Sequence, residues 1–173
     1  MRKVTWGAAA SLDLYIAGPD ESMDWLRWNE EAKAISAESW KGVDAMLMGR
    51  KTYEFAVKSG GGDAGASKVT TYIFSSTMAE APAGAELVKG DAAAFVARLK
   101  ASEGGDIIVL GGGELASALI ESGLVDEIGL NVHPILLGDG IPFFRPMARR
   151  VELALIEARA MTDDCVLLRY RVS

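Results

Sequence analysis

Residues 107–115 read Ile107-Ile108-Val109-Leu110-Gly111-Gly112-Gly113-Glu114-Leu115, and this stretch indicates the fold class. A run of four apolar residues predicts a short strand that is buried on both faces, as in the middle of a parallel sheet. The glycines that follow mark a turn, and residues 114–121, which end before Gly123, predict a helix. The stretch is therefore a strand–turn–helix unit, the building block of an α/β protein.

The same alternation extends to both sides of this unit. The first helix has Asn29 as its N-cap and ends at Gly42, and a later helix is capped by Asp91. Residues 59–65 are rich in glycine and predict a flexible loop. Strands are predicted at residues 4–10, 45–48, 70–74, 85–88 and 128–132, and further helical residues at 53–57 and 94–99.

The C-terminal part of the chain changes character. Residues 151–160 and 166–172 both predict strands, and the intervening Thr162-Asp163-Asp164 predicts a turn. A terminal hairpin after a strand–helix alternation predicts a mostly parallel central sheet that gains antiparallel strands at one edge. We expect a single domain over residues 1–173, because the length suits one ordinary domain.

Composition excludes several classes of protein. Half of the residues are hydrophobic and 24% are charged, which excludes a disordered chain, and the net charge of -6 argues against nucleic-acid binding. Cys165 is the only cysteine and His133 the only histidine, so we expect no internal disulfide and no multi-histidine metal site. No apolar segment approaches the roughly 20 residues of a membrane span. We therefore expect a cytoplasmic protein without a metal.

Two predicted strand-to-helix turns have the residues of phosphate-binding turns. The first is Gly49-Arg50-Lys51-Thr52, in which a glycine permits close approach and the basic residues favour an anion at a helix N-terminus. A solvent-exposed basic turn is the alternative. The second is Gly111-Gly112-Gly113, for which a tight turn with positive φ is the alternative. One or two glycines suffice for such a turn, so three in a row favour backbone contact with a pyrophosphate.

Five short segments follow one another along the chain: residues 11–18 (SLDLYIAG), 48–54 (MGRKTYE), 75–76 (SS), 111–115 (GGGEL) and 134–144 (PILLGDGIPFF). Together and in this order they resemble the dihydrofolate-reductase-like superfamily, in particular the reductase domain of the riboflavin-biosynthesis deaminase-reductases. The resemblance covers nearly the whole chain, and it implies a three-layer fold with helices on both faces of the sheet.

The resemblance implies NADPH as the hydride donor and implies where it binds. The basic turn, Gly49, Arg50, Lys51 and Thr52, would hold the 2′-phosphate and the pyrophosphate, and Ser75 and Ser76 would flank the adenosine end. The second turn would hold the pyrophosphate and nicotinamide side with Gly111, Gly112, Gly113, Glu114 and Leu115. The nicotinamide would be bordered by three small or apolar residues, Ala9, Ile16 and Ala17.

The substrate residues are indicated less directly. Asp13 follows the first strand beside the expected nicotinamide and is our candidate catalytic and substrate-binding residue. Trp25 resembles a substrate-side tryptophan of folate reductases, with a role in the core or in an interface as the alternative. Carboxylates of the first helix (Glu30, Glu31, Glu38) either include an acid or form a solvated face. Leu14 stands where the riboflavin-type pattern has glycine.

The resemblance therefore implies an NADPH-dependent oxidoreductase of a pyrimidine-like or pteridine-like substrate. By its resemblance it is related to 5-amino-6-(5-phosphoribosylamino)uracil reductase or to dihydrofolate reductases. A nucleotide-binding or regulatory domain that keeps the fold without turnover is the alternative. We also expect a homodimer through the apolar edge of the C-terminal hairpin (Val166, Leu168, Tyr170), against the alternative of a monomer that buries this hairpin itself.

Overall fold

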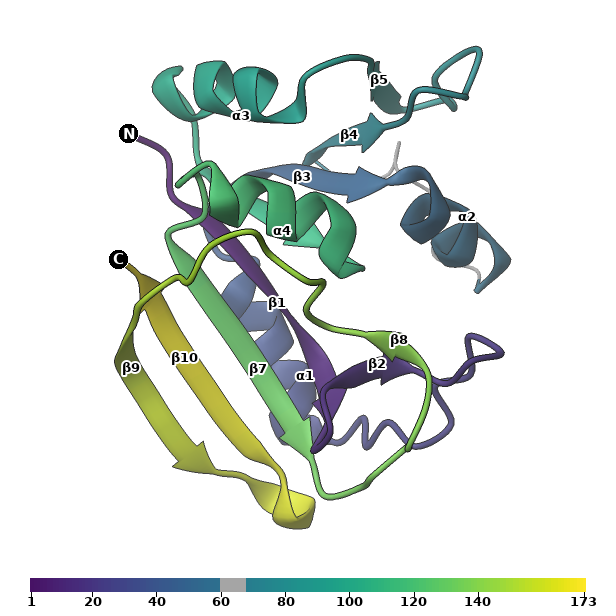
Figure 1. The fold of residues 1–173 in the computed structure, drawn as a ribbon, viewed down its shortest axis with the longest axis vertical. Coiled ribbons are helices and arrows are strands. Elements are labelled where there is room, and N and C mark those ends of the chain that lie inside the picture. Colours follow the sequence, from purple (N-terminus) through teal and green to yellow (C-terminus); the bar gives the residue numbers. More distant parts are fainter. Residues whose placement is uncertain (60–67) are drawn as a thin grey trace.

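The structure, a computed structural model, describes residues 1–59 and 68–173, and Figure 1 shows its ribbon. Apart from Ser59, the predicted glycine-rich loop lies outside the described residues. Eight strands form one sheet in the order β5-β4-β3-β6-β1-β7-β10-β9. These strands are β1 (Val4–Ser11), β3 (Val43–Gly49), β4 (Thr70–Phe74), β5 (Ala85–Val88), β6 (Asp106–Leu110), β7 (Glu127–His133), β9 (Leu153–Ala160) and β10 (Val166–Val172).

Six neighbouring strands, from β5 to β7, are parallel, and β10 and β9 extend the sheet in antiparallel register. This confirms the predicted mostly parallel sheet with an antiparallel C-terminal hairpin. The central position of β6 is also confirmed, because it lies between β3 and β1 and buries Ile107, Ile108 and Val109. The sequence did not predict the separate two-stranded sheet of β2 (Tyr15–Ala17) and β8 (Ile141–Pro142).

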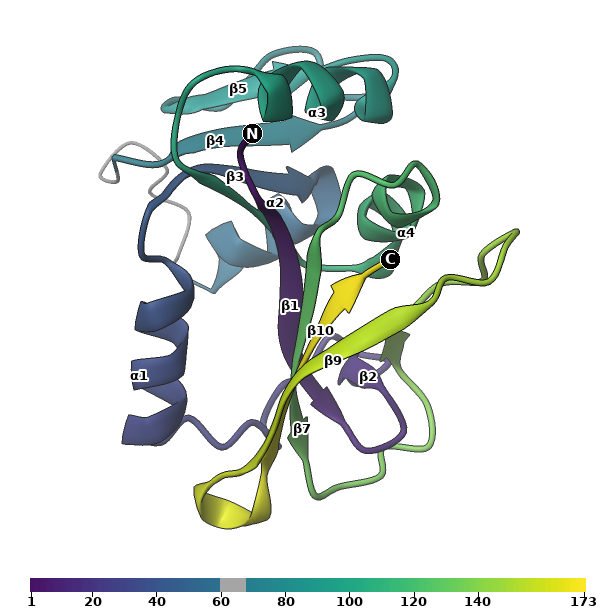
Figure 2. The ribbon, with the colours of Figure 1, turned by 90° about the vertical axis from the view of Figure 1, so that its left-hand side faces the viewer.

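Four helices cover the two faces of the sheet (Figure 2). Helices α1 (Glu30–Ser39) and α2 (Arg50–Lys58) lie on one face, and α3 (Ala92–Ala101) and α4 (Gly113–Glu121) lie on the other. This distribution follows from right-handed crossovers that run in opposite directions along the sheet. The predicted caps are present, since Asn29 accepts a hydrogen bond from Ala32 N and Asp91 accepts one from Ala94 N. No helix in the described ranges has the length and apolar character needed to cross a membrane.

The core lies between the sheet and the helices α3 and α4. Alternate residues of β1, β6 and β7 face these helices, and Trp6 stacks on Phe143 with ring centroids 4.0 Å apart. Because side chains alternate along a strand, the opposite residues of the same strands face α1. The buried residues of this core include Val4, Trp6, Ala10, Ile107, Val109, Leu119, Ile120, Ile128 and Leu130.

The apolar edge of the hairpin differs from the prediction. Strand β10 lies between β7 and β9, so Leu168 packs against the core and Tyr170 is half-buried. The edge strand is β9, where Leu153, Leu155 and Ile156 are exposed. Sequence alternation predicted the strands correctly, but it did not show which of the two hairpin strands pairs with β7.

Candidate cofactor and substrate site

Two helix N-termini lie side by side at the carboxyl end of the sheet. Gly49 is the N-cap of α2 and Gly112 is the N-cap of α4, and neither makes a side-chain capping bond. The strands that lead to them, β3 and β6, are adjacent, with Met48 opposite Leu110. A Cβ atom built at Gly49 or Gly112 has no atom within 4 Å. The free N–H groups of both helices therefore border open space, which fits an anionic group such as a pyrophosphate.

The three glycines of the second turn have different structural reasons. Gly111 has φ +84°, and a Cβ there would lie 2.1 Å from Thr52 Oγ1. A Cβ at Gly113 would lie 2.3 Å from the carbonyl oxygen of Phe143. Gly112 has φ -64° and no such neighbour. Packing and backbone conformation thus explain the first and third glycines, and the open space over Gly112 leaves room for a ligand.

The side chains of the predicted cofactor residues surround these two turns. Arg50 Nη1 pairs with Glu54 Oε1 at 2.6 Å, whereas Lys51 is exposed. Ser75 follows β4, the next strand beyond β3, and its Oγ accepts hydrogen bonds from Thr77 N at 3.2 Å and Met78 N at 3.1 Å. Ser75 therefore shapes its own turn, and the exposed Ser76 beside it is the freer hydroxyl.

The remaining predicted cofactor residues lie on β1, β2 and α4. Ala9 is in β1, Ile16 and Ala17 are in β2, and Ala17 is buried beneath Gly140. In the first turn of α4, the side chain of Glu114 is exposed and that of Leu115 packs against the core. These two residues can offer a ligand backbone N–H groups rather than side-chain contacts.

Asp13 acts as an anchor for the loop that follows β7. Its carboxylate accepts hydrogen bonds from Ser11 Oγ at 2.6 Å, Gly138 N at 2.8 Å and Leu137 N at 3.1 Å. The hydrogen bond from Ser11, assisted by those from Gly138 and Leu137, lowers the pKa of this carboxyl. A carboxylate held by three donors with a lowered pKa is a poor proton donor at neutral pH.

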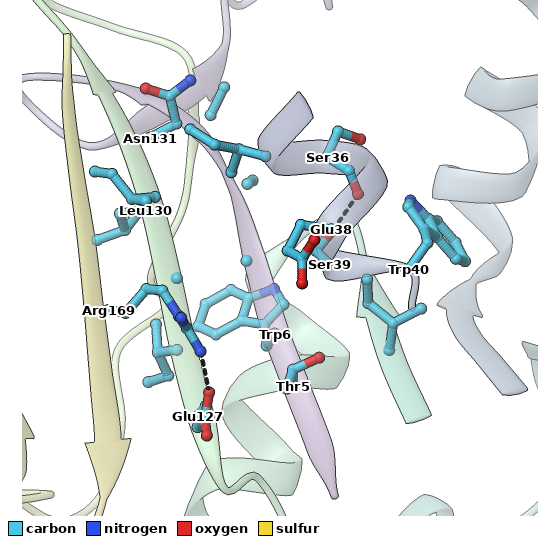
Figure 3. A pocket seen from close by; sticks show the side chains of 18 of the residues that line it. Thr5, Trp6, Ser36, Glu38, Ser39, Trp40, Glu127, Leu130, Asn131 and Arg169 are labelled. Atoms are coloured by element: carbon cyan, nitrogen blue, oxygen red, sulfur yellow. Dashed lines mark hydrogen bonds and ion pairs between the residues drawn. The ribbon is translucent and has the colours of Figure 1, made fainter. Parts of the chain in front are cut away.

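A cavity of about 550 Å³ separates α1 from the sheet (Figure 3). Ala32, Ile35, Ser36 and Ser39 line it from α1, and Trp28 and Trp40 flank that helix. The sheet side includes Gly7, Ala9, Leu110, Gly129, Asn131 and Leu167. Ala9 thus joins the cavity to the region of the predicted nicotinamide.

The floor of the cavity is flat at its centre. Gly7 lies opposite Gly129 on the neighbouring strands β1 and β7. A Cβ at Gly129 would meet no atom within 4 Å, whereas a Cβ at Gly7 would lie 2.6 Å from Gly129 O. A glycine in a strand with open space above it marks a place where another group can approach the backbone closely. The sequence contains a signal for this floor, because Gly129 stands between the polar residues Glu127 and Asn131 of the same strand face.

Charged side chains cross the cavity floor as a ladder of alternating sign, formed by Lys3, Glu127, Arg169, Glu157, Arg159 and Glu31. Glu127 pairs with Lys3 at 3.4 Å and with Arg169 at 3.0 Å. Glu157 pairs with Arg169 at 3.6 Å and with Arg159 at 3.0 Å. Arg159 also pairs with Glu31 of α1 at 2.8 Å. The ladder therefore joins the residue before β1 and the strands β7, β10 and β9 to the first turn of α1.

The first-helix carboxylates are all ion-paired. Glu31 accepts hydrogen bonds from Thr162 N at 2.8 Å and Thr162 Oγ1 at 2.9 Å, and these bonds and Arg159 lower the pKa of its carboxyl. Glu30 pairs with Lys33, and Glu38 pairs with Lys41. Of the three, only Glu38 lines the cavity.

The predicted substrate tryptophan does not line the cavity. Trp25 packs edge-to-face on His133 with ring centroids 5.3 Å apart, and Trp28 and Trp40 line the cavity instead. His133 is fully buried and its Nδ1 lies 3.1 Å from Asn131 O, so it is a packed residue. Cys165 is also buried, and burial raises the pKa of its thiol.

Known proteins are similar to this chain over most of its length. The chain is 33% identical over 156 residues to the uncharacterized protein YwjB of Bacillus subtilis (strain 168), covering 89% of each chain. A putative riboflavin biosynthesis protein from Shewanella sp. PV-4 has a TM-score of 0.85, 27% identity and 99% coverage of both chains.

Dihydrofolate reductase from Enterococcus faecalis, solved with NADP(H), has a TM-score of 0.70 at 14% identity, covering 99% of this chain and 96% of its own. That likeness shows the dihydrofolate-reductase-like fold. The profile of the RibD C-terminal domain matches residues 2–167. The chain therefore belongs to the RibD C-terminal domain family.

Proposed function

We propose that this protein is an NADPH-dependent reductase of a small heterocyclic compound. One observation carries the proposal: two uncapped helix N-termini face open space at the ends of the adjacent strands β3 and β6, and a cavity starts at Ala9 on β1, the strand next to β6. This arrangement provides a place for a diphosphate across the carboxyl ends of the strands and a separate place for a substrate. The fold and the reductase relatives support the same reading.

Each part of the cofactor has residues that fit it. The N–H groups that follow Gly49 and Gly112 would bind the pyrophosphate, and the glycines leave room for it. Lys51 and Arg50 would bind the 2′-phosphate, for which Arg50 must exchange its contact with Glu54. Ser76 would contact the adenosine end. The nicotinamide, when bound beside Ala9, supplies the hydride.

The cavity between α1 and the sheet would hold the substrate next to Ala9. Here α1 is a wall that limits access of water to the reacting face, and Gly7 and Gly129 let a ring lie against the sheet. Asp13 would position the Leu137–Gly138 backbone rather than donate a proton. In this proposal the chain binds and orients both reactants, and the proton is supplied by water.

The engagement of Asp13 and of all three α1 carboxylates also fits a second candidate, a domain that binds the nucleotide without turnover. Two measurements separate the candidates: NADPH fluorescence on binding, and NADPH oxidation with a panel of pterins, dihydrofolate and uracil derivatives. Binding with oxidation supports the reductase. Binding with no oxidation across the panel supports the second candidate, and absence of NADPH binding contradicts both.

A further inference from the structure

We propose that the substrate of this cavity is a planar heterocycle without a phosphate group. The inference rests on the proposed function, because it takes the cavity between α1 and the sheet as the substrate site. It comes from the ion pairs of the cavity walls, from the two glycines of the floor and from one unpartnered amide oxygen.

Every cation that lines the cavity, within residues 1–59 and 68–173, is paired with a carboxylate. Lys3, Arg169 and Arg159 belong to the ladder, and Lys41 pairs with Glu38 at 2.5 Å. Four lining carboxylates, Glu38, Asp106, Glu127 and Glu157, balance these four cations. Residues 60–67, outside the described ranges, contain no lysine or arginine in their sequence. A phosphate dianion in this cavity would meet at least as much negative as positive charge.

Phosphate recognition normally uses a free arginine fork, a lysine or a helix N-terminus. The uncapped helix N-termini of Gly49 and Gly112 are assigned to the cofactor, and neither glycine lines the cavity. To bind a phosphate, Arg169 or Lys3 would have to leave Glu127, which would then keep only one of its two cationic partners. The cavity is therefore poorly suited to the phosphorylated uracil derivative that the family resemblance suggests.

The same walls suit an uncharged ring. Gly7 and Gly129 form a flat floor, and Trp28, Ile35 and Trp40 provide an apolar and aromatic wall opposite it. Asn131 is among the side chains that line the cavity (Figure 3), and its Oδ1 is buried with no hydrogen-bond partner among the described residues. An amide oxygen accepts hydrogen bonds, so a ring N–H or amino group that reaches this oxygen would satisfy it. Nucleobase-like and pterin-like rings carry such donors.

The inference is tested by calorimetric titration with a matched pair of compounds. The pair is 5-amino-6-(5-phosphoribosylamino)uracil and the same compound without its phosphate, each added to the protein alone and to its NADP⁺ complex. We expect the compound without phosphate to bind at least tenfold more tightly. Equal affinities, tighter binding of the phosphorylated compound, or binding of neither compound to a protein that binds NADP⁺ would overturn the inference and leave the cofactor assignment intact. Loss of NADP⁺ binding would instead contradict the proposed function.

Two variants test the structural reasons. Gly129→Val places a side chain where a Cβ has no atom within 4 Å, so it should fold, keep NADPH binding and lose binding of the heterocycle more than tenfold. The matched control is Ala158→Val, at an exposed position of β9. Unchanged heterocycle binding in Gly129→Val contradicts the use of this floor.

Glu127→Gln releases Lys3 and relieves Arg169 of one of its partners. We expect the affinity for the phosphorylated compound to rise about tenfold relative to the other, whereas Glu30→Gln, on the exposed face of α1, leaves both affinities unchanged. An unchanged ratio in Glu127→Gln contradicts the role of the paired cations.

Discussion

Thr52, in the first turn of α2, packs against the backbone of Gly111, where a Cβ would lie 2.1 Å from Thr52 Oγ1. The two proposed phosphate-binding turns are therefore in direct contact, although 59 residues separate these two positions in the sequence. This contact fixes the relative position of the two helix N-termini. A substitution at Gly111, within the contact, should therefore affect the protein differently from a substitution at Gly112, which borders open space.

Adjacent glycines of the second turn should respond in opposite ways to substitution. Gly112→Val is expected to keep the fold and abolish NADPH binding, because its side chain enters open space over the helix N-terminus. Gly111→Ala is expected to lower the free energy of unfolding by more than about 2 kcal/mol, since it combines a clash with an unfavourable φ. Urea unfolding and NADPH fluorescence distinguish the two, and unchanged cofactor binding by Gly112→Val would show that the glycines only make a turn.

Arg50→Ala should reduce the preference for NADPH over NADH. A charge-assisted contact with the 2′-phosphate contributes about 1.5–3 kcal/mol, which corresponds to roughly a tenfold to hundredfold difference in affinity. The dissociation constants of both nucleotides are measured for the wild type, for Arg50→Ala and for the control Lys58→Ala at the other end of α2. Equal wild-type affinities for the two nucleotides would remove the basis of this prediction.

The stability provided by Asp13 should depend on pH in one direction. Its pKa is lower in the folded protein than in the unfolded chain, so its contribution is present above about pH 4 and is lost as the pH falls through the folded pKa. Asp13→Asn should lower the Tm at pH 7, and the difference from the wild type should shrink toward pH 2.5. We expect this variant to retain NADPH oxidation, and a complete loss of oxidation with the Tm unchanged would return Asp13 to a proton-donating role.

Leu14 adopts a backbone conformation that favours glycine, with φ 64°. Its N–H donates to Ser11 O and its carbonyl accepts from Phe143 N, so the turn keeps this conformation whichever residue occupies it. Leu14→Gly stabilises the folded protein by about 1–2 kcal/mol, because it removes the strain of a positive φ. It also destabilises the folded protein by about 0.4–1 kcal/mol, because glycine has more conformational entropy in the unfolded chain. The Tm of this variant should therefore equal or exceed that of the wild type. Leu14→Val should be less stable than both, and thermal melts of the three proteins check this order.

Strand β9 should mediate pairing with a second copy of this chain. It is an eight-residue edge strand with Leu153, Leu155 and Ile156 exposed, and a long apolar edge of this kind is normally covered. A second β9 in antiparallel register is self-complementary about a two-fold axis, so we propose a homodimer. Light scattering should give twice 18.4 kDa for the wild type and 18.4 kDa for Leu155→Lys. A wild-type mass of 18.4 kDa that persists on concentration would contradict the dimer.

The parallel strands and their turns could be predicted because each is encoded within a short stretch. Residues 107–115 specify a buried strand, a turn and a helix start locally, and the caps Asn29 and Asp91 are read directly from residue type. Strands β2 and β8 were missed because they are short, and each is defined by the other rather than by its own pattern.

The cavity could not be predicted because its residues come together only in the fold. Glu127, Arg169, Glu157 and Arg159 lie on three strands and Lys3 directly precedes a fourth, and neither their pairing nor their common face follows from their spacing. Asp13 was correctly expected to follow the first strand, yet its engagement by Gly138 depends on a loop 125 residues away. Residue type therefore located the turns, and tertiary contacts determined what each side chain is free to do.

Helix α1 is attached mainly through its first turn, where Asn29 and Glu31 bond to Thr162 and Arg159, and Ala32 is its only buried residue. Substitutions along its cavity side, at Ser36 or Ser39, therefore alter the wall without touching the core that holds the sheet together. The first turn of α1 thus attaches the helix to the rest of the protein, whereas its later cavity-facing residues can be changed to alter which ligands bind. Directed evolution restricted to α1 and Trp40 is accordingly a route to new substrates at little cost in folding.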